Sequence, residues 1–276
     1  MGTVRKTRIV VPCYNEAKRL DCDAFLTALA HDASLSFLFV NDGSTDDTLT
    51  LLQRLKEGNP AQVALLCLEK NAGKAEAVRQ GMLKALEGPF TYIGYWDADL
   101  ATPLDTIASF CHVLDSTDAE VVIGARVRLL GRKVERQALR HYLGRVFATC
   151  ASLLLGIPVY DTQCGAKIFR RNDALRHVFG KPFKVKWTFD VEMIARFGIV
   201  ADAPAKDSGS RWFEYPLVKW VDVKGSKVKS SDFLKGALEF ALLCTYLMTP
   251  LRRSYKKYLL ENITAPSVKA TIGVVE

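Results

Sequence analysis

The sequence places two carboxylates, Asp97 and Asp99, directly after a short apolar run, residues 91–96. Such a run predicts a buried strand. Because side chains alternate along a strand, Asp97 and Asp99 are expected to point the same way from its end. Paired carboxylates there suit a hard divalent cation that also binds phosphate oxygens. A turn with two solvated acids explains an isolated pair equally well, so the neighbouring residues have to decide.

Polar residues also follow the other apolar runs of the first half. Asp42 comes after the run 36–40, where its carboxylate could accept hydrogen bonds from a base or a ribose, and Gly43 permits close backbone approach. Lys74 opens a predicted helix and could reach a phosphate, although a solvated lysine is the more common arrangement. The other polar residues at these run ends are Asn15, Glu16, Asn71 and Arg126.

Strands and helices are expected to alternate over the first 125 residues. This alternation predicts an α/β fold with a mostly parallel central sheet and helices on both faces. In such sheets ligands bind beyond the carboxyl ends of the strands, so the polar residues at the run ends should meet in one site. The strands are expected at 8–12, 36–40, 62–68, 91–96 and 120–123, and helices at 20–33, after Asp46, at 73–86 and at 103–115.

The second half of the sequence has a different pattern. A basic stretch, 126–145, precedes a predicted helix at 146–155, and most of its arginines would also fit a solvated helical face. No linker-like tract or internal repeat follows, so we expect one α/β domain, 1–231, with a helical, basic appendage, 232–276. Within the domain, a polar loop at 161–165 leads to a strand at 166–170, a helix at 188–197 and a strand at 212–221.

Bulk composition limits the function classes. The 276 residues are 49% hydrophobic and 25% charged, which is an ordinary globular composition, and the net charge of +8 favours an anionic partner. A nucleic-acid-binding protein is one alternative. It would need aromatic residues for base stacking among the basic ones, and the stretch 126–145 offers only Tyr142, so no nucleic-acid partner is expected.

Cysteine usage and the apolar segments bear on the compartment. Seven cysteines, an odd number with no CxxC pair, are expected to be small buried thiols rather than disulfides or a zinc site. Residues 1–8 are polar and basic, unlike a signal peptide, and no apolar stretch is long enough to span a membrane. We therefore expect a cytoplasmic protein, with peripheral attachment to the cytoplasmic face of a membrane as an option.

Four segments of the first half, in this order, resemble the family-2 glycosyltransferases, which have the GT-A fold. They are VVPCYNE at 10–16, VNDGSTD at 40–46, NAGKA at 71–75 and DADL at 97–100. Later segments resemble the branch of that family that contains the dolichyl-phosphate glucosyltransferases and dolichol-phosphate mannose synthases: GAR at 124–126, DTQCGAKIF at 161–169, WTFDVE at 187–192 and GSK at 225–227. The sequence departs from this branch at Ala166, where a bulkier aromatic is expected, and in lacking membrane helices.

The resemblance implies an inverting transfer of a hexose, with glucose from UDP-glucose as the first choice, to a polyprenyl or dolichyl phosphate. It implies that Asp97 contacts the donor and that Asp99 binds Mg²⁺ or Mn²⁺ at the diphosphate. Arg126 and Arg140 would hold the acceptor phosphate, because a guanidinium matches phosphate oxygens through paired hydrogen bonds. The donor nucleotide would be bound by Pro12, Asn15, Glu16, Asp42, Lys74 and Lys227.

The role of Asp190 depends on the acceptor. A phosphate acceptor is ionised at neutral pH and needs no base, so Asp190 would then position the donor sugar or serve a structural purpose. A saccharide or another lipid acceptor would instead require Asp190 as the base that deprotonates a hydroxyl. Glu192, two residues later, is expected to be structural.

An apolar segment, 233–248, suggests how the protein could reach a lipid. As a helix it would span about 24 Å, less than the ~30 Å hydrocarbon core, and it contains Lys235 and Glu239, which a spanning helix disfavours. The basic residues after Pro250, interleaved with Tyr255 and Tyr258, suit a helix lying on an anionic membrane surface. A helix packed on the domain with a solvated basic tail fits the same residues, and the sequence leaves both possibilities open.

Overall fold

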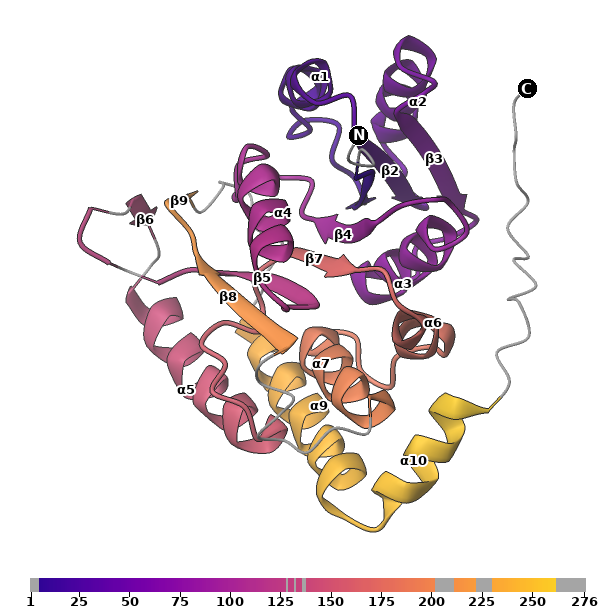
Figure 1. The fold of residues 1–276 in the computed structure, drawn as a ribbon. Helices are drawn as coiled ribbons and strands as arrows, with labels where there is room; N and C mark the ends of the chain where they lie inside the picture. The colour runs from indigo at the N-terminus through magenta and orange to yellow at the C-terminus, as the bar shows by residue number, and fades with distance from the viewer. Residues whose placement is uncertain are drawn as a thin grey trace.

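A seven-stranded sheet forms the centre of the computed structural model, which describes residues 5–127, 129–131, 133–135, 138–201, 211–221 and 230–261. The strand order is β3-β2-β1-β4-β7-β5-β8, and the sheet runs across the middle of Figure 1. The predicted α/β class is confirmed. The strands are β1 (Thr7–Cys13), β2 (Leu35–Asp42), β3 (Val63–Leu68), β4 (Tyr92–Trp96), β5 (Val121–Ala125), β7 (Ala166–Arg170) and β8 (Trp212–Pro216).

Most of the sheet is parallel, as predicted, and β7 is the exception. It lies between β4 and β5 and is antiparallel to both, with Trp96 paired to Ala166 and Ile123 paired to Lys167. The parallel register of β1 and β2 pairs Cys13 with Asn41. The carboxyl ends of these strands therefore meet at one edge of the sheet, where the polar residues were expected.

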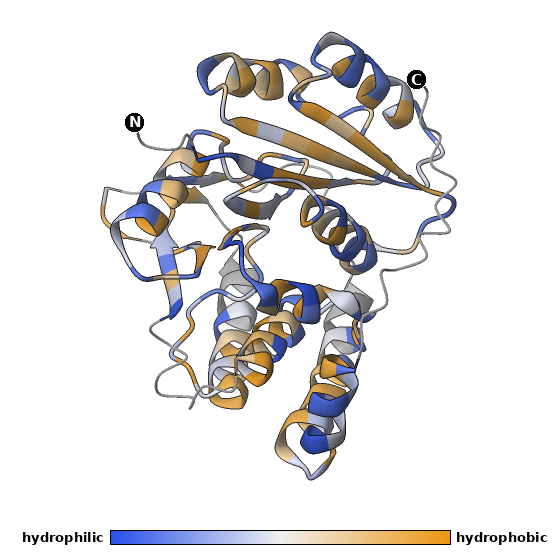
Figure 2. Cartoon of the chain, turned by 45° about the vertical axis from the view of Figure 1, so that its right-hand side comes forward, coloured by the Kyte–Doolittle hydropathy of each residue, from blue (hydrophilic) through white to orange (hydrophobic). Residues whose placement is uncertain are grey.

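Helices cover both faces of the sheet, because its strands contribute apolar side chains to a separate core on each face. Figure 2 shows that several of the strands are hydrophobic over most of their length. One face packs against α1 (Cys22–His31), α2 (Thr48–Gly58) and α4 (Thr106–Ser116), which bury Phe25, Leu52 and Phe110. The other face packs against α3 (Lys74–Ala85), α6 (Asp173–Gly180) and α7 (Phe189–Val200). The helix α6 was not predicted from the sequence.

The predicted strand 212–221 is two strands in the structure. After β8, which pairs with β5, the chain turns away, and β9 (Lys219–Val221) pairs with β6 (Lys133–Glu135) in a second, two-stranded sheet. Pro216 ends β8, consistent with its lack of a backbone N–H. The short β6, inside the basic stretch, was also not predicted.

Three helices of the second half form a further layer below the sheet in Figure 1: α5 (Ala138–Leu155), α9 (Ser230–Met248) and α10 (Leu251–Leu260). Together with α7 they enclose an apolar cluster that includes Val191, Leu243, Leu247 and Leu259. The predicted boundary at residue 231 falls in the first turn of α9. Within the described residues, no helix is both long and apolar enough to cross a membrane.

Two side chains in this layer bear on the expectations from the sequence. Tyr255 fits the helix packed on the domain, one of the two possibilities left open: it is buried, and its hydroxyl bonds to Glu192 and Arg196 of α7. Cys150 was expected to be buried and is exposed on α5, whereas Cys13 and Cys164 are buried as expected. All seven cysteines are free thiols, as predicted.

Candidate active site

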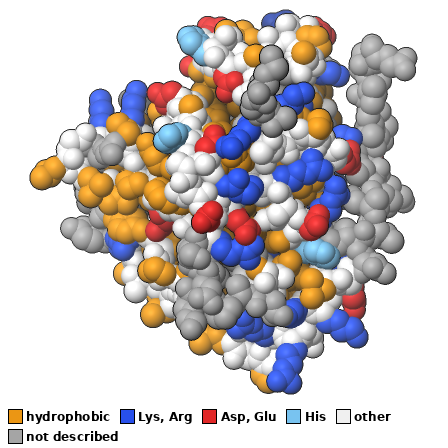
Figure 3. Space-filling model, viewed as in Figure 1, with side chains coloured by type: hydrophobic (Ala, Val, Ile, Leu, Met, Phe, Trp, Pro, Cys, Tyr) orange, Lys and Arg blue, Asp and Glu red, His pale blue; other side chains and the backbone are white. Residues whose placement is uncertain are grey.

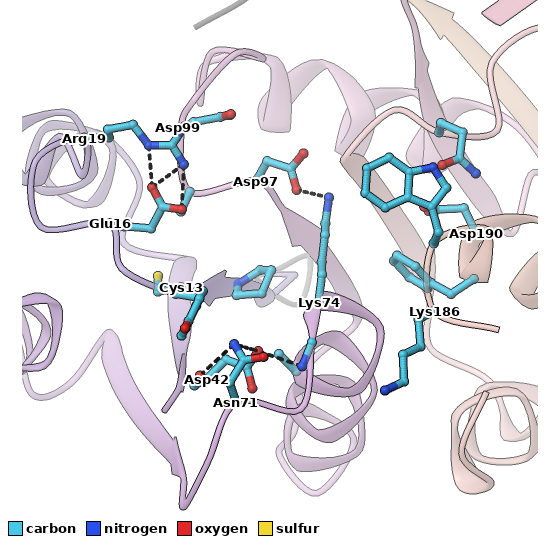
Figure 4. Close-up of a pocket in the computed structure, with 18 of the residues that line it drawn as sticks. Cys13, Glu16, Arg19, Asp42, Asn71, Lys74, Asp97, Asp99, Lys186 and Asp190 are labelled. Carbon is cyan, nitrogen blue, oxygen red and sulfur yellow. Dashed lines mark hydrogen bonds and ion pairs between the residues drawn. The ribbon is translucent and has the colours of Figure 1, made fainter. Parts of the chain in front are cut away.

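A cavity of about 550 Å³ opens where β1, β2 and β4 end. Its opposite wall is formed by residues 186–190 at the start of α7, and Figure 4 shows Lys186 and Asp190 across from Cys13 and Asp42, with Lys74 and Asp97 between them. One side of the cavity is thus built by the ends of β1, β2 and β4, and the other by the residues at the start of α7. It brings together eight residues predicted from the sequence: Pro12, Glu16, Asp42, Lys74, Asp97, Asp99, Arg126 and Asp190.

Asp42, at the end of β2, holds the loop before α3. Its Oδ1 accepts a hydrogen bond from the Ala72 backbone N–H at 2.7 Å, and its Oδ2 accepts from Gly73 N at 2.9 Å and Asn71 Nδ2 at 3.1 Å. Burial raises the pKa of Asp42 above its ordinary value, although these hydrogen bonds work in the opposite direction. The carboxylate is therefore a fixed acceptor at the floor of the cavity.

Gly43 allows this arrangement. Its φ is +62°, and a Cβ there would lie 2.5 Å from the Asn71 backbone nitrogen. A side chain at residue 43 would therefore push the 70–73 loop away from the end of β2.

Asn15 lies outside the cavity lining, contrary to its predicted place in the nucleotide pocket. Its backbone has φ 50°, its Oδ1 accepts a hydrogen bond from Thr45 N at 2.8 Å, and its own N–H donates to Ser44 Oγ at 3.1 Å. Asn15 thus ties the loop after β1 to the loop after β2. The neighbouring Glu16 does line the cavity, where Arg19 binds its carboxylate through Nε at 2.9 Å and a terminal nitrogen at 2.7 Å.

Asp97 and Asp99 both line the cavity, but they do not point the same way. Residues 97–100 form a turn, with Leu100 N bonded to Asp97 O at 3.2 Å, so the alternation of a strand does not apply to them. Figure 4 shows Asp97 directed to Lys74 and Asp99 lying near Glu16 and Arg19. Burial, and then the charge of Asp97, raise the pKa of Asp99.

Lys74 is the cation at the centre of the cavity. It is the first residue of α3, and its Nζ lies 2.5 Å from Asp97 Oδ1. Burial opposes its charge, yet Asp97, followed by Asp190 and Asp99, raises the pKa of Lys74. Lys74 is therefore a positive charge that Asp97 holds in place at the cavity.

Asp190 belongs to a buried polar group that the sequence did not reveal. Its Oδ1 accepts hydrogen bonds from Tyr95 OH and from Lys167 Nζ, each at 2.5 Å. Lys167, in β7, is fully buried and also donates to Cys164 O at 2.5 Å. Burial and then Asp190 raise the pKa of Tyr95 far above its ordinary value, so the phenol remains a donor. Asp190 is thus held in one orientation at the cavity wall.

Arg126 lines the cavity and is paired with a buried acid. Its Nε and a terminal nitrogen bind the two carboxylate oxygens of Asp161 at 2.6 and 2.8 Å, and its guanidinium lies 5.3 Å from the centre of the Trp220 ring. Although burial opposes its charge, Asp161 raises the pKa of Arg126. Arg140 lies in α5, but its side chain falls outside the described residues, as does Lys227 altogether.

Several lining residues were not selected from the sequence as site residues. They include Cys13, Arg19, Gln163, Lys186 and Trp187. Among the described residues, the side-chain nitrogen of Gln163 is a buried donor with no hydrogen-bond partner. An unsatisfied buried donor in a cavity is available to an oxygen atom of a ligand.

The acids of the cavity fit a divalent cation only in part. Among the described residues, no group of three His, Cys, Asp or Glu side chains could hold a metal ion. Asp97 and Asp99 offer hard oxygen donors, which suit Mg²⁺ or Mn²⁺ when a bound diphosphate and water supply the other ligands. The residues present therefore fit a cation that binds together with a nucleotide diphosphate.

Comparisons with known proteins agree with this geometry. The family model described as Glycosyl transferase family 2 matches residues 8–178. A dolichyl-phosphate beta-glucosyltransferase of Trichomonas vaginalis is 31% identical over 258 residues, covering 89% of this chain and 72% of the relative. The dolichyl-phosphate beta-glucosyltransferase of Dictyostelium discoideum is 30% identical, covering 80% of this chain and 68% of that protein. The one of Saccharomyces cerevisiae is 27% identical, covering 90% of this chain and 77% of that protein.

Two solved structures share the fold. Glucosyl-3-phosphoglycerate synthase from Mycobacterium tuberculosis, in complex with Mn²⁺, UDP-glucose and phosphoglyceric acid, has a TM-score of 0.60 at 16% identity and covers 89% of this chain and 81% of that one. Staphylococcus aureus TarS 1–349, in complex with UDP-GlcNAc, has a TM-score of 0.54 at 16% identity, and the match covers 92% of this chain and 70% of that one. The predicted GT-A fold is confirmed.

Proposed function

Because this chain belongs to glycosyl transferase family 2, we propose that it transfers glucose from UDP-glucose to dolichyl phosphate or a similar polyprenyl phosphate, with inversion at the anomeric carbon. The observation that carries the proposal is the cavity itself. It joins a carboxylate pair, Asp97 and Asp99, to fixed cations at Lys74 and Arg126. Acids for a metal-bound diphosphate, one cation beside that diphosphate (Lys74) and another for the acceptor phosphate (Arg126) are what a transfer between two phosphates requires.

The donor nucleotide occupies the side built from β1 and β2. Asp42 accepts hydrogen bonds from the base or ribose, while Pro12 and Glu16 line the same side. Lys74 then lies beside the diphosphate, where its charge stabilises the oxygens that become negative as UDP leaves. Two further residues were predicted for this side: Lys227 lies outside the described residues, and Asn15 lies outside the cavity lining.

Asp99, together with Asp97, would hold Mg²⁺ or Mn²⁺ at the diphosphate. The cation supplies Lewis-acid stabilisation of the leaving diphosphate. A structural neighbour is crystallised with Mn²⁺ and UDP, which supports a divalent metal here. Asp97 also contacts Lys74 and so links the metal side of the cavity to the cation side.

The acceptor phosphate occupies the opposite side, near Arg126 and Lys186. Its oxygen is ionised at neutral pH and attacks the anomeric carbon as UDP departs, so no side chain has to remove a proton. Asp190, fixed by Lys167 and Tyr95, orients the sugar, and the free N–H groups of Gln163 are available to a sugar hydroxyl or a phosphate oxygen.

A donor and acceptor panel tests the proposal. The purified protein is assayed with UDP-glucose, UDP-GlcNAc and GDP-mannose, each with dolichyl phosphate, dolichol and a free sugar, in Mg²⁺ or Mn²⁺. Glucosyl transfer confined to dolichyl phosphate and UDP-glucose supports it. Transfer to a hydroxyl acceptor that Asp190→Asn abolishes would instead establish Asp190 as a base.

Such a lipid substrate favours contact with a membrane surface. Leucines of α9, Leu238 and Leu242, are exposed, as are Val146 and Leu153 of α5, and the ring centres of Phe147 and Phe240 lie 5.5 Å apart between the two helices. We propose that this apolar α5–α9 face lies on the cytoplasmic leaflet. Exposed basic residues of α10, Arg252, Arg253 and Lys257, suit anionic lipids.

A second exposed apolar area lies on the left of Figure 3, over β6 and β9, where Leu130 and Val218 are exposed.

Vesicle sedimentation measures the contribution of the α5–α9 face. Leu238→Ser with Leu242→Ser should weaken binding to anionic vesicles, whereas Leu26→Ser, on the distant α1, should not. Equal binding of all three proteins would rule this face out.

A further inference from the structure

One carboxylate of helix α9 binds the backbone of the far cavity wall. Glu239 Oε1 accepts a hydrogen bond from Lys186 N at 3.1 Å, and its Oε2 accepts from Trp187 N at 2.8 Å and Thr188 N at 3.0 Å. The hydroxyl of Thr188 donates to the same oxygen at 3.3 Å. Lys186 and Trp187 line the cavity, so a residue outside the cavity holds two of its lining residues by their backbone.

The preceding part of the same loop is held from α7. Glu192 accepts hydrogen bonds from the backbone N–H groups of Lys184 and Val185, and Arg196 donates to the carbonyls of Val178, Lys181 and Pro182. These two residues lie within twenty positions of the groups they bind. Glu239 lies more than fifty positions from residues 186–188, so this part of the wall depends on a distant helix.

The side chain of Trp187 also rests on α9. A Cβ on Gly236, one turn before Glu239, would lie 3.0 Å from Cδ1 of the Trp187 indole. Trp187 as a whole is nevertheless 40% exposed, and it lines the cavity. α9 therefore contacts both the backbone and the ring of this residue.

The hydrogen bonds of Glu239 also bear on the position of Asp190. Thr188 is the N-cap of α7, and Asp190 lies in the first turn of that helix. Lys167 and Tyr95 hold the Asp190 side chain, while Glu239 holds the backbone of Thr188, two residues before Asp190. A negative charge at a helix N-terminus is also favourable for the helix dipole.

We propose that Glu239 is a positioning residue for the acceptor, and that the wall it holds recognises a phosphate carrying a hydrocarbon chain. Lys186 provides a cation for the phosphate, and the exposed indole of Trp187 provides an apolar surface for the first part of the chain. This inference rests on the proposed function for the identity of the acceptor. It also makes α9, whose outer face carries Leu238 and Leu242, part of the active site on its inner face.

The test compares Glu239→Ala and Glu239→Gln with wild type, using Glu57→Gln on the exposed side of α2 as the matched control. The KM for dolichyl phosphate should rise at least tenfold in Glu239→Ala and less in Glu239→Gln, because the amide keeps one acceptor oxygen. The Kd for UDP, measured by calorimetry, should change less than twofold in every variant. Glu57→Gln should match wild type throughout.

A spectroscopic measurement separates this inference from the proposed function. The emission of Trp187, isolated by subtracting spectra of the matching Trp187→Phe proteins, should move to longer wavelength in Glu239→Ala. If wild type does not use dolichyl phosphate but this shift occurs, the proposed acceptor is wrong and the positioning role stands.

Two results would overturn the inference. One is an unchanged Trp187 emission together with an unchanged KM for the acceptor, whatever happens to the melting temperature. The other is an equal loss of UDP affinity and acceptor KM, which would indicate general damage to the fold. Should Glu239→Ala fail to fold, Gly236→Ala displaces Trp187 with Glu239 intact and should raise the acceptor KM alone.

Discussion

Replacing Gly165 by alanine should inactivate the enzyme without unfolding it. Gly165 precedes β7, and its carbonyl accepts a hydrogen bond from Asp97 N at 3.0 Å. A Cβ on Gly165 would lie 1.9 Å from Oδ2 of Asp97, 2.1 Å from its Cγ and 2.5 Å from its Oδ1. The added methyl group would therefore occupy the place of the Asp97 carboxylate.

The expected magnitudes separate activity from stability. To reach ordinary contact at 3.4 Å, Asp97 Oδ2 has to move by about 1.5 Å. Because both oxygens belong to one rigid carboxylate, this movement also breaks the 2.5 Å contact between Asp97 Oδ1 and Lys74 Nζ. A displacement of ~1 Å at a reacting centre can cost about 100-fold in rate. The half-exposed Lys74–Asp97 pair contributes only ~0–1 kcal/mol to the free energy of unfolding.

Steady-state kinetics and thermal unfolding test this directly. For Gly165→Ala we expect kcat to fall about 100-fold, while the melting temperature changes by roughly 4 °C or less. Gly198→Ala, in α7, is the matched control, since a Cβ there meets no atom within 4 Å. Alanine at that helical position should raise the free energy of unfolding by about 0.4–1 kcal/mol and leave kcat unchanged.

The reasoning fails if Gly165→Ala keeps wild-type kcat, because the position of the Asp97 carboxylate would then not matter for turnover. It also fails if the melting temperature falls by ten degrees or more, because the clash would then be relieved by the backbone rather than by the Asp97 side chain. A crystal structure of the variant would show which atoms moved.

Three further predictions concern the metal, the acceptor and pH. Asp99→Asn should lower turnover by about 100-fold or more with little change in melting temperature; full activity of wild type in EDTA would contradict it. Arg126→Lys keeps the charge beside Asp161 but loses the paired hydrogen bonds of the guanidinium, so the KM for the acceptor should rise about tenfold while UDP affinity is retained. An equal loss of UDP affinity, measured by calorimetry, would show that Arg126 belongs to the donor side. Because the pKa of Asp42 is raised, its ionised form should be lost at higher pH than for an ordinary aspartate, so the Kd for UDP-glucose should increase as pH falls through that raised value; Asp42→Asn should bind weakly but without this pH dependence, and parallel profiles would refute the assignment.

The strand ends of the first half could be predicted from the sequence because they depend on local signals. Apolar runs such as 36–40 lie in strands that are buried on both faces, and the first polar residue after each run must lie at the sheet edge. Asp42 and Asp97 were found in this way. The shared edge follows from parallel pairing, which the alternation of strands and helices already implies.

Contacts between distant segments could not be predicted. Lys167 lies in an apolar strand sequence, and nothing near it indicates that its ammonium is buried against Asp190. The antiparallel position of β7 between β4 and β5 likewise depends on the tertiary arrangement, since the sequence of a five-residue strand does not indicate whether it pairs in a parallel or an antiparallel direction. The place of Tyr255 stayed open for the same reason, because its hydrogen-bonding partners lie about sixty residues earlier.

Asn15 shows a different limit. The family resemblance predicted that Asn15, like its neighbours, lies in the nucleotide pocket. Its backbone is instead in the left-handed region, and its side chain is directed toward Thr45. A motif fixes which residues are near a site. It does not fix which of them face it.

The place of β7 in the sheet has a consequence for the order in which the protein can fold. β4 follows β1 to β3 along the chain and pairs with β1, whereas β5 has only β7 and β8 as neighbours. During synthesis β5 must therefore wait until residue 170 has been made before it can join the sheet. Such late, non-local pairing slows folding and leaves an apolar strand exposed meanwhile. The contact between Asp97 and Gly165 forms at the same step, so the Asp97 carboxylate acquires its position in the cavity only when the two halves of the sheet are joined.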